Sequence, residues 1–164
     1  FQMMQYSDII FGDQNEWEIA SGVPHIPFEA LDADYEIAKE AYLEYFRKMH
    51  QLFPKCKKMV MAIRNQIASS HHTLSGLLYD AVEDQLYTTR IYDIEPIVDP
   101  MGVGDAFIAA YIHAHQKWGD KNQYCLDFSL SASAIKNTVP GDQNLVTEEE
   151  IINNMTSSGG RIQR

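Results

Sequence analysis

The chain has 164 residues, of which 45% are hydrophobic and 22% are charged, and its formal net charge is −10. This length and apolar content suit one domain with a sizeable core. The acidic balance argues against a nucleic-acid or anionic-membrane surface, because either partner would need a basic patch. No stretch reaches the roughly 18 apolar residues that a membrane helix needs.

The two cysteines carry the only signal about compartment. Cys56 and Cys125 lie far apart and form no CxxC pair or regular metal-binding spacing. Such thiols are typical of idle, buried side chains in a reducing environment. The sequence therefore predicts a cytoplasmic protein.

The first part of the chain predicts one strand and two helices. Residues 4–11 (MQYSDIIF) form a short apolar run that predicts a buried strand, and residues 13–20 predict a short helix. A longer amphipathic helix is expected from an N-cap at Asp32 to the residues before Pro54, because apolar side chains recur along one face.

The middle of the chain predicts strands. The apolar run 58–64 has strand length, and the β-rich runs 75–79 and 85–93 flank a polar turn, which predicts a hairpin. A further strand at 94–98 is expected to lead into a glycine-rich turn.

The remaining part of the chain, from residue 105 onward, is predicted to be mainly helical. Helices are expected at 105–117 and 123–137, and the capping box at 147–150 predicts a last short helix. Residues 157–164 are expected to form a flexible tail, which leaves 1–156 as the folded domain. Strands that alternate with helices predict an α/β sheet with helices on its faces.

The segment 99–107 (DPMGVGDAF) places two glycines and an acid at the start of a predicted helix. It lacks the Gly-Lys-Ser/Thr of a Walker A loop, and Phe107 replaces the third glycine of a dinucleotide fingerprint. Glycines at a helix start can direct backbone N–H groups at a phosphoryl anion, aided by the helix dipole. The amides that would form this anion hole are those of Gly102, Val103 and Gly104, together with the amide of Asp105.

Asp105 follows these glycines directly. A carboxylate beside an anion hole can accept the proton of an attacking hydroxyl, as phosphoryl transfer requires. The alternative is a purely structural glycine turn with an aspartate at the helix start.

The segment 99–107 resembles the D-T-x-G-A-G-D-x-F signature of the ribokinase-like (PfkB-type) carbohydrate kinases. Further segments resemble the 2-keto-3-deoxygluconate kinases of that family: 7–12, 62–64, 74–79, 92–99, 134–144 and 160–164. The resemblance covers nearly the whole chain in order. It implies the C-terminal portion of a ribokinase-like three-layer α/β/α sandwich, with a β-hairpin before the glycine motif.

The resemblance implies an activity for the intact protein: ATP-dependent, Mg²⁺-assisted phosphorylation of a sugar or sugar acid, with 2-keto-3-deoxygluconate as the expected substrate. Asp105 would be the catalytic base. Asp13 and Glu16 stand at the family's N-x-x-E motif, which helps to position magnesium, although Asp13 replaces the usual asparagine.

Nucleotide contacts are implied at three positions. Arg64 would contact a phosphate or the sugar acid, with an exposed salt bridge as the alternative. The adenine is expected between the loop after the hairpin and the helix that carries Ser131 and Ser133, and helix packing is the alternative role of these serines.

Length is the main departure from the family, whose members are much longer. The chain is therefore expected to be the C-terminal half of a sugar kinase, inactive alone. Its expected partners are a sugar or sugar acid, ATP and the missing N-terminal half. The alternatives are a non-catalytic fragment or interaction module with a residual anion site, and a fructokinase or ribokinase of the same superfamily. Uncovered sheet edges would also favour homo-oligomers.

Overall fold

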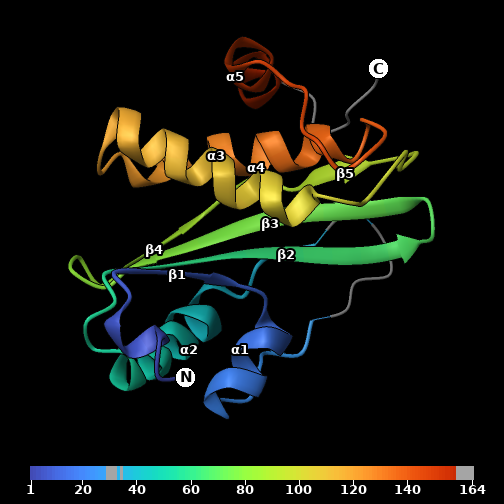
Figure 1. Cartoon of the computed structure of the whole chain (residues 1–164). Helices are drawn as coiled ribbons and strands as arrows, with labels where there is room; N and C mark the ends of the chain where they lie inside the picture. The colour runs from blue at the N-terminus through green and yellow to red at the C-terminus, as the bar shows by residue number, and fades with distance from the viewer. Residues whose placement is uncertain (29–32, 34, 158–164) are drawn as a thin grey trace.

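The computed structural model describes residues 1–28, 33 and 35–157 (Figure 1). Its elements are, in chain order, η1 (Met4–Tyr6), β1 (Ile9–Gly12), α1 (Gln14–Ser21), α2 (Lys39–Leu52), β2 (Lys58–Ala68), β3 (His71–Asp80), β4 (Gln85–Thr88), β5 (Tyr92–Ile94), α3 (Val103–Trp118), α4 (Asn122–Lys136) and α5 (Glu148–Thr156). The N-cap expected at Asp32 and residues 158–164 of the expected tail lie outside the described residues.

In the described part of the chain, one mixed sheet of five strands forms the centre of the molecule. The path runs β1-β2-β3-β4, and β5 also pairs with β3. β1 is parallel to β2, whereas β2, β3, β4 and β5 are joined by antiparallel pairs. The β3–β4 pair is the predicted hairpin.

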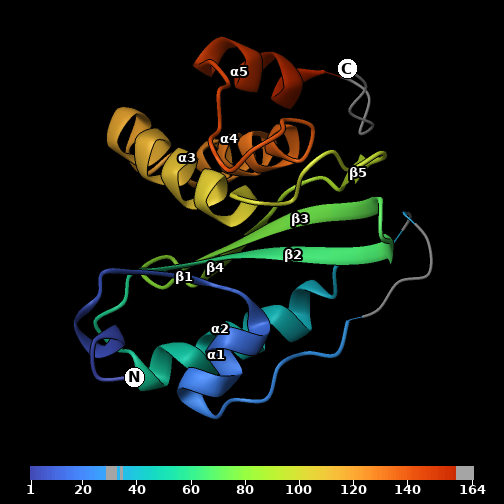
Figure 2. The same ribbon diagram turned by 45° about the vertical axis from the view of Figure 1, so that its right-hand side comes forward.

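Helices cover both faces of this sheet, as predicted for an α/β fold. α1 and α2 lie on one face, α3 and α4 lie on the other, and α5 packs on the outside of α4 (Figures 1 and 2). Alternate residues of β2 and β3 point to opposite faces. Val60 and Leu78 therefore join the core under α3 and α4, while Met59 and Leu77 join the core against α1 and α2.

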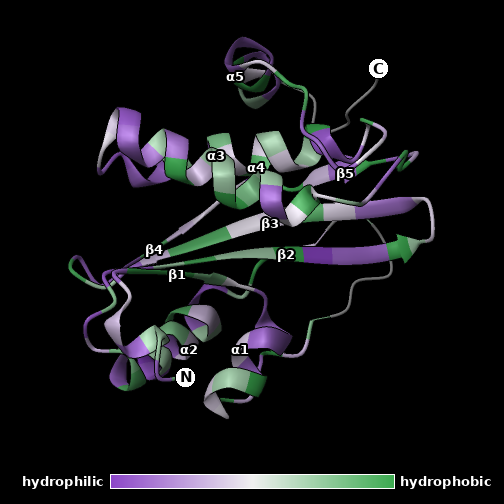
Figure 3. Cartoon of the chain, in the orientation of Figure 1, coloured by the Kyte–Doolittle hydropathy of each residue, from purple (hydrophilic) through white to green (hydrophobic). Residues whose placement is uncertain are grey.

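Hydrophobic residues occur along the strands and in the helices on both sides of the sheet (Figure 3), and they form two core clusters. Phe46 and Met49 of α2 are fully buried against one face, and Tyr111 and Leu130 are fully buried over the other. The sheet thus supports two separate cores, and the α3–α4 core holds the glycine motif in place.

Several predicted boundaries are wrong: the strand expected at 85–93 ends at Thr88, and the strand expected at 58–64 continues to Ala68. The strand expected at 4–11 begins only at Ile9, after a 3-10 turn, and α2 begins at Lys39. The strand expected at 94–98 ends at Ile94. After it, Ile97 N–H donates to Ser70 O and Val98 N–H donates to Asn137 O, so these amides bond to loops rather than to a ladder.

A buried polar network ties the sheet to the start of α4. Lys58 Nζ lies 2.6 Å from both Asp120 Oδ1 and Asn122 Oδ1, and 3.6 Å from Asp80 Oδ2. Asn122 Nδ2 donates to Asp80 Oδ2 at 2.8 Å. Because Lys58 and Asp80 are almost fully buried, the network stabilises the fold only while each charge keeps its partners.

We expect Lys58→Met to lower the free energy of unfolding by about 3 kcal/mol, the lower end of the cost of breaking a buried ion pair, since Asp80 keeps other donors. The neighbouring Lys57 pairs with Asp8 in solvent, so Lys57→Met should leave stability nearly unchanged. Chemical denaturation of both variants checks this. If both variants lost the same free energy of unfolding, the buried network would contribute no more to stability than the exposed Lys57–Asp8 pair.

Candidate active site

The first turn of α3 contains the glycine motif. Gly102 precedes it with φ 74° and ψ 5°, a left-handed conformation that favours glycine. The first helical bond runs from Ala106 N–H to Gly102 O at 2.9 Å, and among the described residues no side chain caps the helix. The amides of Val103, Gly104 and Asp105 therefore have no acceptor within the helix.

Asp99 fixes the bend that leads into α3. Its Oδ1 accepts the Met101 N–H at 2.9 Å, and its Oδ2 accepts the Gly141 N–H at 2.8 Å. These two bonds hold the pKa of Asp99 below its ordinary value. Because Val98 N–H also donates to Asn137 O, the bend is attached to the loop that follows α4.

The two glycines of the bend have different surroundings. A Cβ on Gly102 would lie 2.2 Å from Asp142 O, so the loop after α4 approaches the backbone there more closely than any side chain would permit. A Cβ on Gly104 would meet nothing within 4 Å. Gly104 and Asp105 are exposed, so the amides and the carboxylate face an open surface.

Asp13 and Glu16 meet at the junction of β1 and α1. Asp13 Oδ1 accepts the Glu16 N–H at 2.9 Å, and Glu16 Oε2 accepts the Asp13 N–H at 3.0 Å, which makes a complete capping box. The described residues contain no cluster of three or more His, Cys, Asp or Glu that could hold a metal by itself. The metal role of this pair stays a prediction.

Arg64 projects from β2 on the face of the sheet that α3 covers. It pairs in register with Leu74, which belongs to the core under α3, and its own side chain is exposed. His72 lies diagonally across on β3, buried, and its ring nitrogens have no partner among the described residues. Burial, then Arg64 and His71, lower the pKa of His72. No sequence motif marks His72.

Ser131 and Ser133 are not presented to a ligand. Ser131 Oγ donates to Ile151 O at 2.8 Å, and Ser133 Oγ donates to Val103 O at 3.1 Å. Both side chains are buried. The packing alternative accounts for them: the two serines attach α5 and the first turn of α3 to α4.

A slot of about 270 Å³ begins one turn beyond the glycines, between α3, α4 and the loop before α5. Small or apolar side chains form much of its wall: Ala106, Ala109, Ala110, Phe128, Ala132 and Val146. The alanines on α3 that line this slot carry no motif in the sequence, whereas Ser131 and Ser133 do not line it.

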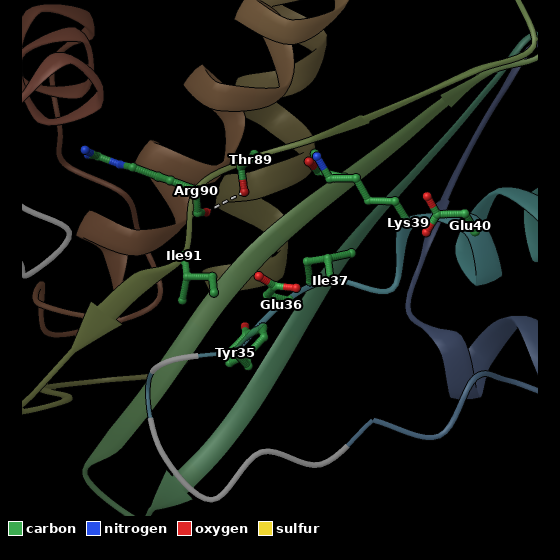
Figure 4. A pocket seen from close by; sticks show the side chains of 9 residues that line it. Tyr35, Glu36, Ile37, Lys39, Glu40, Thr89, Arg90 and Ile91 are labelled. Atoms are coloured by element: carbon green, nitrogen blue, oxygen red, sulfur yellow. Dashed lines mark hydrogen bonds between the residues drawn. The ribbon is translucent and has the colours of Figure 1, made fainter.

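A second cavity of about 520 Å³ lies between the residues before α2 and those after β4, including Tyr35, Lys39 and Thr89 (Figure 4). The Arg90 side chain points away from it, and its guanidinium donates to the carbonyls of Asn154 and Ser157. None of the residues assigned to the glycine motif lines this cavity. It is therefore separate from the site at α3.

Within the described part of the chain, no helix combines the length and the apolar character that a bilayer crossing requires.

Several solved structures similar to this chain are carbohydrate kinases. A 2-dehydro-3-deoxygluconokinase from Thermotoga maritima matches with 26% identity and a TM-score of 0.80, over 95% of this chain and 43% of its own. A PfkB family carbohydrate kinase from Listeria grayi matches with 24% identity and a TM-score of 0.76, over 95% and 43%. The ribokinase of Arabidopsis thaliana, solved with ribose and ATP, matches with 20% identity and a TM-score of 0.69, over 96% and 43%.

No protein-family model and no curated protein sequence matches the chain. The structural matches nevertheless confirm the resemblance that rested on the glycine motif, and they confirm the fold. The chain spans less than half the length of these relatives.

We expect Gly102→Ala to lower the free energy of unfolding by more than about 2 kcal/mol, because a left-handed alanine costs roughly 1–2 kcal/mol before the contact with Asp142 O is counted. Gly104→Ala is the matched control. It has room for its Cβ and should leave stability unchanged or slightly higher. Denaturant titrations of the two variants test this prediction. A larger loss of stability in Gly104→Ala than in Gly102→Ala would contradict the geometry.

The Asp99 tether should respond to acid. Because its pKa is depressed in the folded chain, the tether is complete above the ordinary value of about 3.9 and is lost as the pH falls through the lower folded value. In an NMR titration, the amide shifts of Met101 and Gly141 should change together with a midpoint below about 3.9. Asp99→Asn should abolish this transition. A midpoint at or above the ordinary value would contradict the tether.

Proposed function

We propose that this chain, which has the fold of the C-terminal part of the PfkB-type carbohydrate kinases, supplies the phosphoryl-transfer and nucleotide-binding half of an ATP-dependent sugar kinase. One observation carries the proposal. The first turn of α3 offers the amides of Val103, Gly104 and Asp105 without helical acceptors, beside an exposed acid. These are the parts that phosphoryl transfer needs from a protein.

In the proposed reaction, the γ-phosphoryl group of ATP passes to a sugar hydroxyl at this turn. The N–H groups and the positive end of the helix dipole stabilise the negative charge on the transferred group. Asp105 accepts the proton of the attacking hydroxyl. Gly104, which leaves open space above the turn, lets the phosphate approach the backbone.

The slot beside α3 is the proposed place for the base of ATP. Its alanine-rich wall starts at Ala106, directly after the proposed phosphate site, and small side chains leave room for a flat ring. The resemblance in fold to a ribokinase solved with ribose and ATP supports this choice of nucleotide.

Magnesium would be held at the capping box. The capping bonds use Oδ1 of Asp13 and Oε2 of Glu16, so each carboxylate keeps a second oxygen. Mg²⁺ in phosphate-binding sites usually takes one or two carboxylates together with phosphate oxygens and water. These residues fit such an ion, which would neutralise charge on the phosphates when bound.

A sugar acid, with 2-keto-3-deoxygluconate as the first choice, is the proposed substrate. The 2-dehydro-3-deoxygluconokinase among the structural relatives supports it. Arg64 is exposed on the sheet face that α3 covers, where a guanidinium suits a carboxylate or a phosphate. We also propose a cytoplasmic location, which fits the buried free thiols of Cys56 and Cys125.

A second candidate function is nucleotide binding without catalysis: the chain alone would bind nucleotide but would not phosphorylate a sugar. The observation that favours it is coverage: the chain matches only 43% of the length of its relatives. Within the described residues β1 pairs only with β2, so its other edge is available to a sugar-binding N-terminal half, or to a second copy.

In the protein that combines this chain with such a half, we expect Asp105→Asn to lower kcat by roughly 10²–10⁴-fold, the usual contribution of a general base. Binding of MgATP should persist, because the amides remain. Glu44→Gln, an exposed acid on the distant helix α2, is the control and should keep full activity. Near-normal turnover of Asp105→Asn would contradict the assignment of Asp105 as the general base.

The chain alone should bind MgATP without phosphorylating a sugar acid. Turnover by the isolated chain would contradict the need for a second half.

A further inference from the structure

The slot beside α3 has two ends. One end lies at the proposed phosphate site near Gly102, and the far end lies at Glu148. The loop 142–147 connects two points along α3. Asp142 O approaches Gly102 closely, and Glu148, the first residue of α5, bonds to His113 and Lys117, three to four turns further along α3. A nucleotide whose phosphates lie at Gly102 must therefore direct its base towards Glu148.

Glu148 makes three side-chain contacts at this far end. Its Oε1 accepts from Lys117 Nζ at 2.6 Å, and its Oε2 lies 2.8 Å from both Lys117 Nζ and His113 Nε2. Glu148 lines the slot, and its side chain is 36% exposed. A carboxylate offers about four lone-pair sites, so these three contacts leave capacity for one more donor.

The charge state of this acid follows from the same contacts. Hydrogen bonds from Lys117, then from His113, hold the pKa of Glu148 below its ordinary value. Near neutral pH the side chain is ionised and can only accept hydrogen bonds. An acceptor in a fixed position distinguishes an amino group from a carbonyl oxygen on a base edge.

We propose that Glu148 selects the base of the nucleotide: its carboxylate accepts a hydrogen bond from the exocyclic amino group of adenine and disfavours guanine. A guanine bound in the same pose would place its carbonyl oxygen, instead of an amino group, against the carboxylate, with no proton between them. This inference rests on the proposed function, because it assumes a nucleotide in the slot. It adds the residue that determines which nucleotide is used.

The test compares the affinities of MgATP and MgGTP for the chain by equilibrium titration. The unaltered chain should prefer ATP by roughly tenfold or more. Glu148→Gln should bring the ratio close to one, because an amide can turn to donate to the guanine carbonyl. Glu148→Ala should also lose the preference. Glu149→Gln removes an equal charge from the same turn of α5 and should keep the full preference.

The ratio of the MgATP and MgGTP affinities distinguishes base selection by Glu148 from a purely structural role of this residue. If Glu148 only attaches α5 to α3, its substitution weakens both nucleotides equally and the ATP preference survives, which overturns the inference while the proposed function stands. Equal affinities for ATP and GTP in the unaltered chain overturn it as well. If neither nucleotide binds, the proposed function fails and the inference fails with it.

Discussion

One constrained residue organises the site: Gly102 in its left-handed conformation, with the Asp142 carbonyl directly behind it. On one side, Asp99 bonds the bend to the loop after α4. On the other, α3 starts with free amides. Because the loop after α4 holds the bend on one side, the opposite side of the first turn of α3 stays open. The bend also sets the direction of α3 and of the slot beside it.

The rest of the fold holds this bend still. The sheet supplies the floor, and the α3–α4 pair forms the layer above it. The hydroxyls of Ser129 and Ser133 donate to the carbonyls of Phe107 and Val103, so α4 holds the first turns of α3 at two successive points. Small residues on α4 thus fix the position of the first turns of α3, where we propose that phosphate binds.

Sequence reasoning succeeded where signals are local. The glycine motif, the β3–β4 hairpin and the capping box at Thr147 each depend on neighbours within a few residues, and the structure contains all three. It failed where long-range contacts decide, as at Ile97 and Val98, whose amides bond to Ser70 and Asn137 instead of extending β5. The hydroxyls of Ser131 and Ser133 bond to carbonyls of α5 and α3, in line with the helix-packing alternative. A periodic pattern cannot supply that information.

The central claim is that the first turn of α3 binds the phosphates of a nucleotide and the adjoining slot holds its base. A titration of the isotopically labelled chain with MgATP, followed by NMR, tests this most directly. The account predicts that the largest amide shifts occur at residues 102–106 and at the slot alanines, with small changes at Thr88–Ile91 by the other cavity. Shifts centred on that other cavity, or no saturable shifts at the α3 turn, would contradict it.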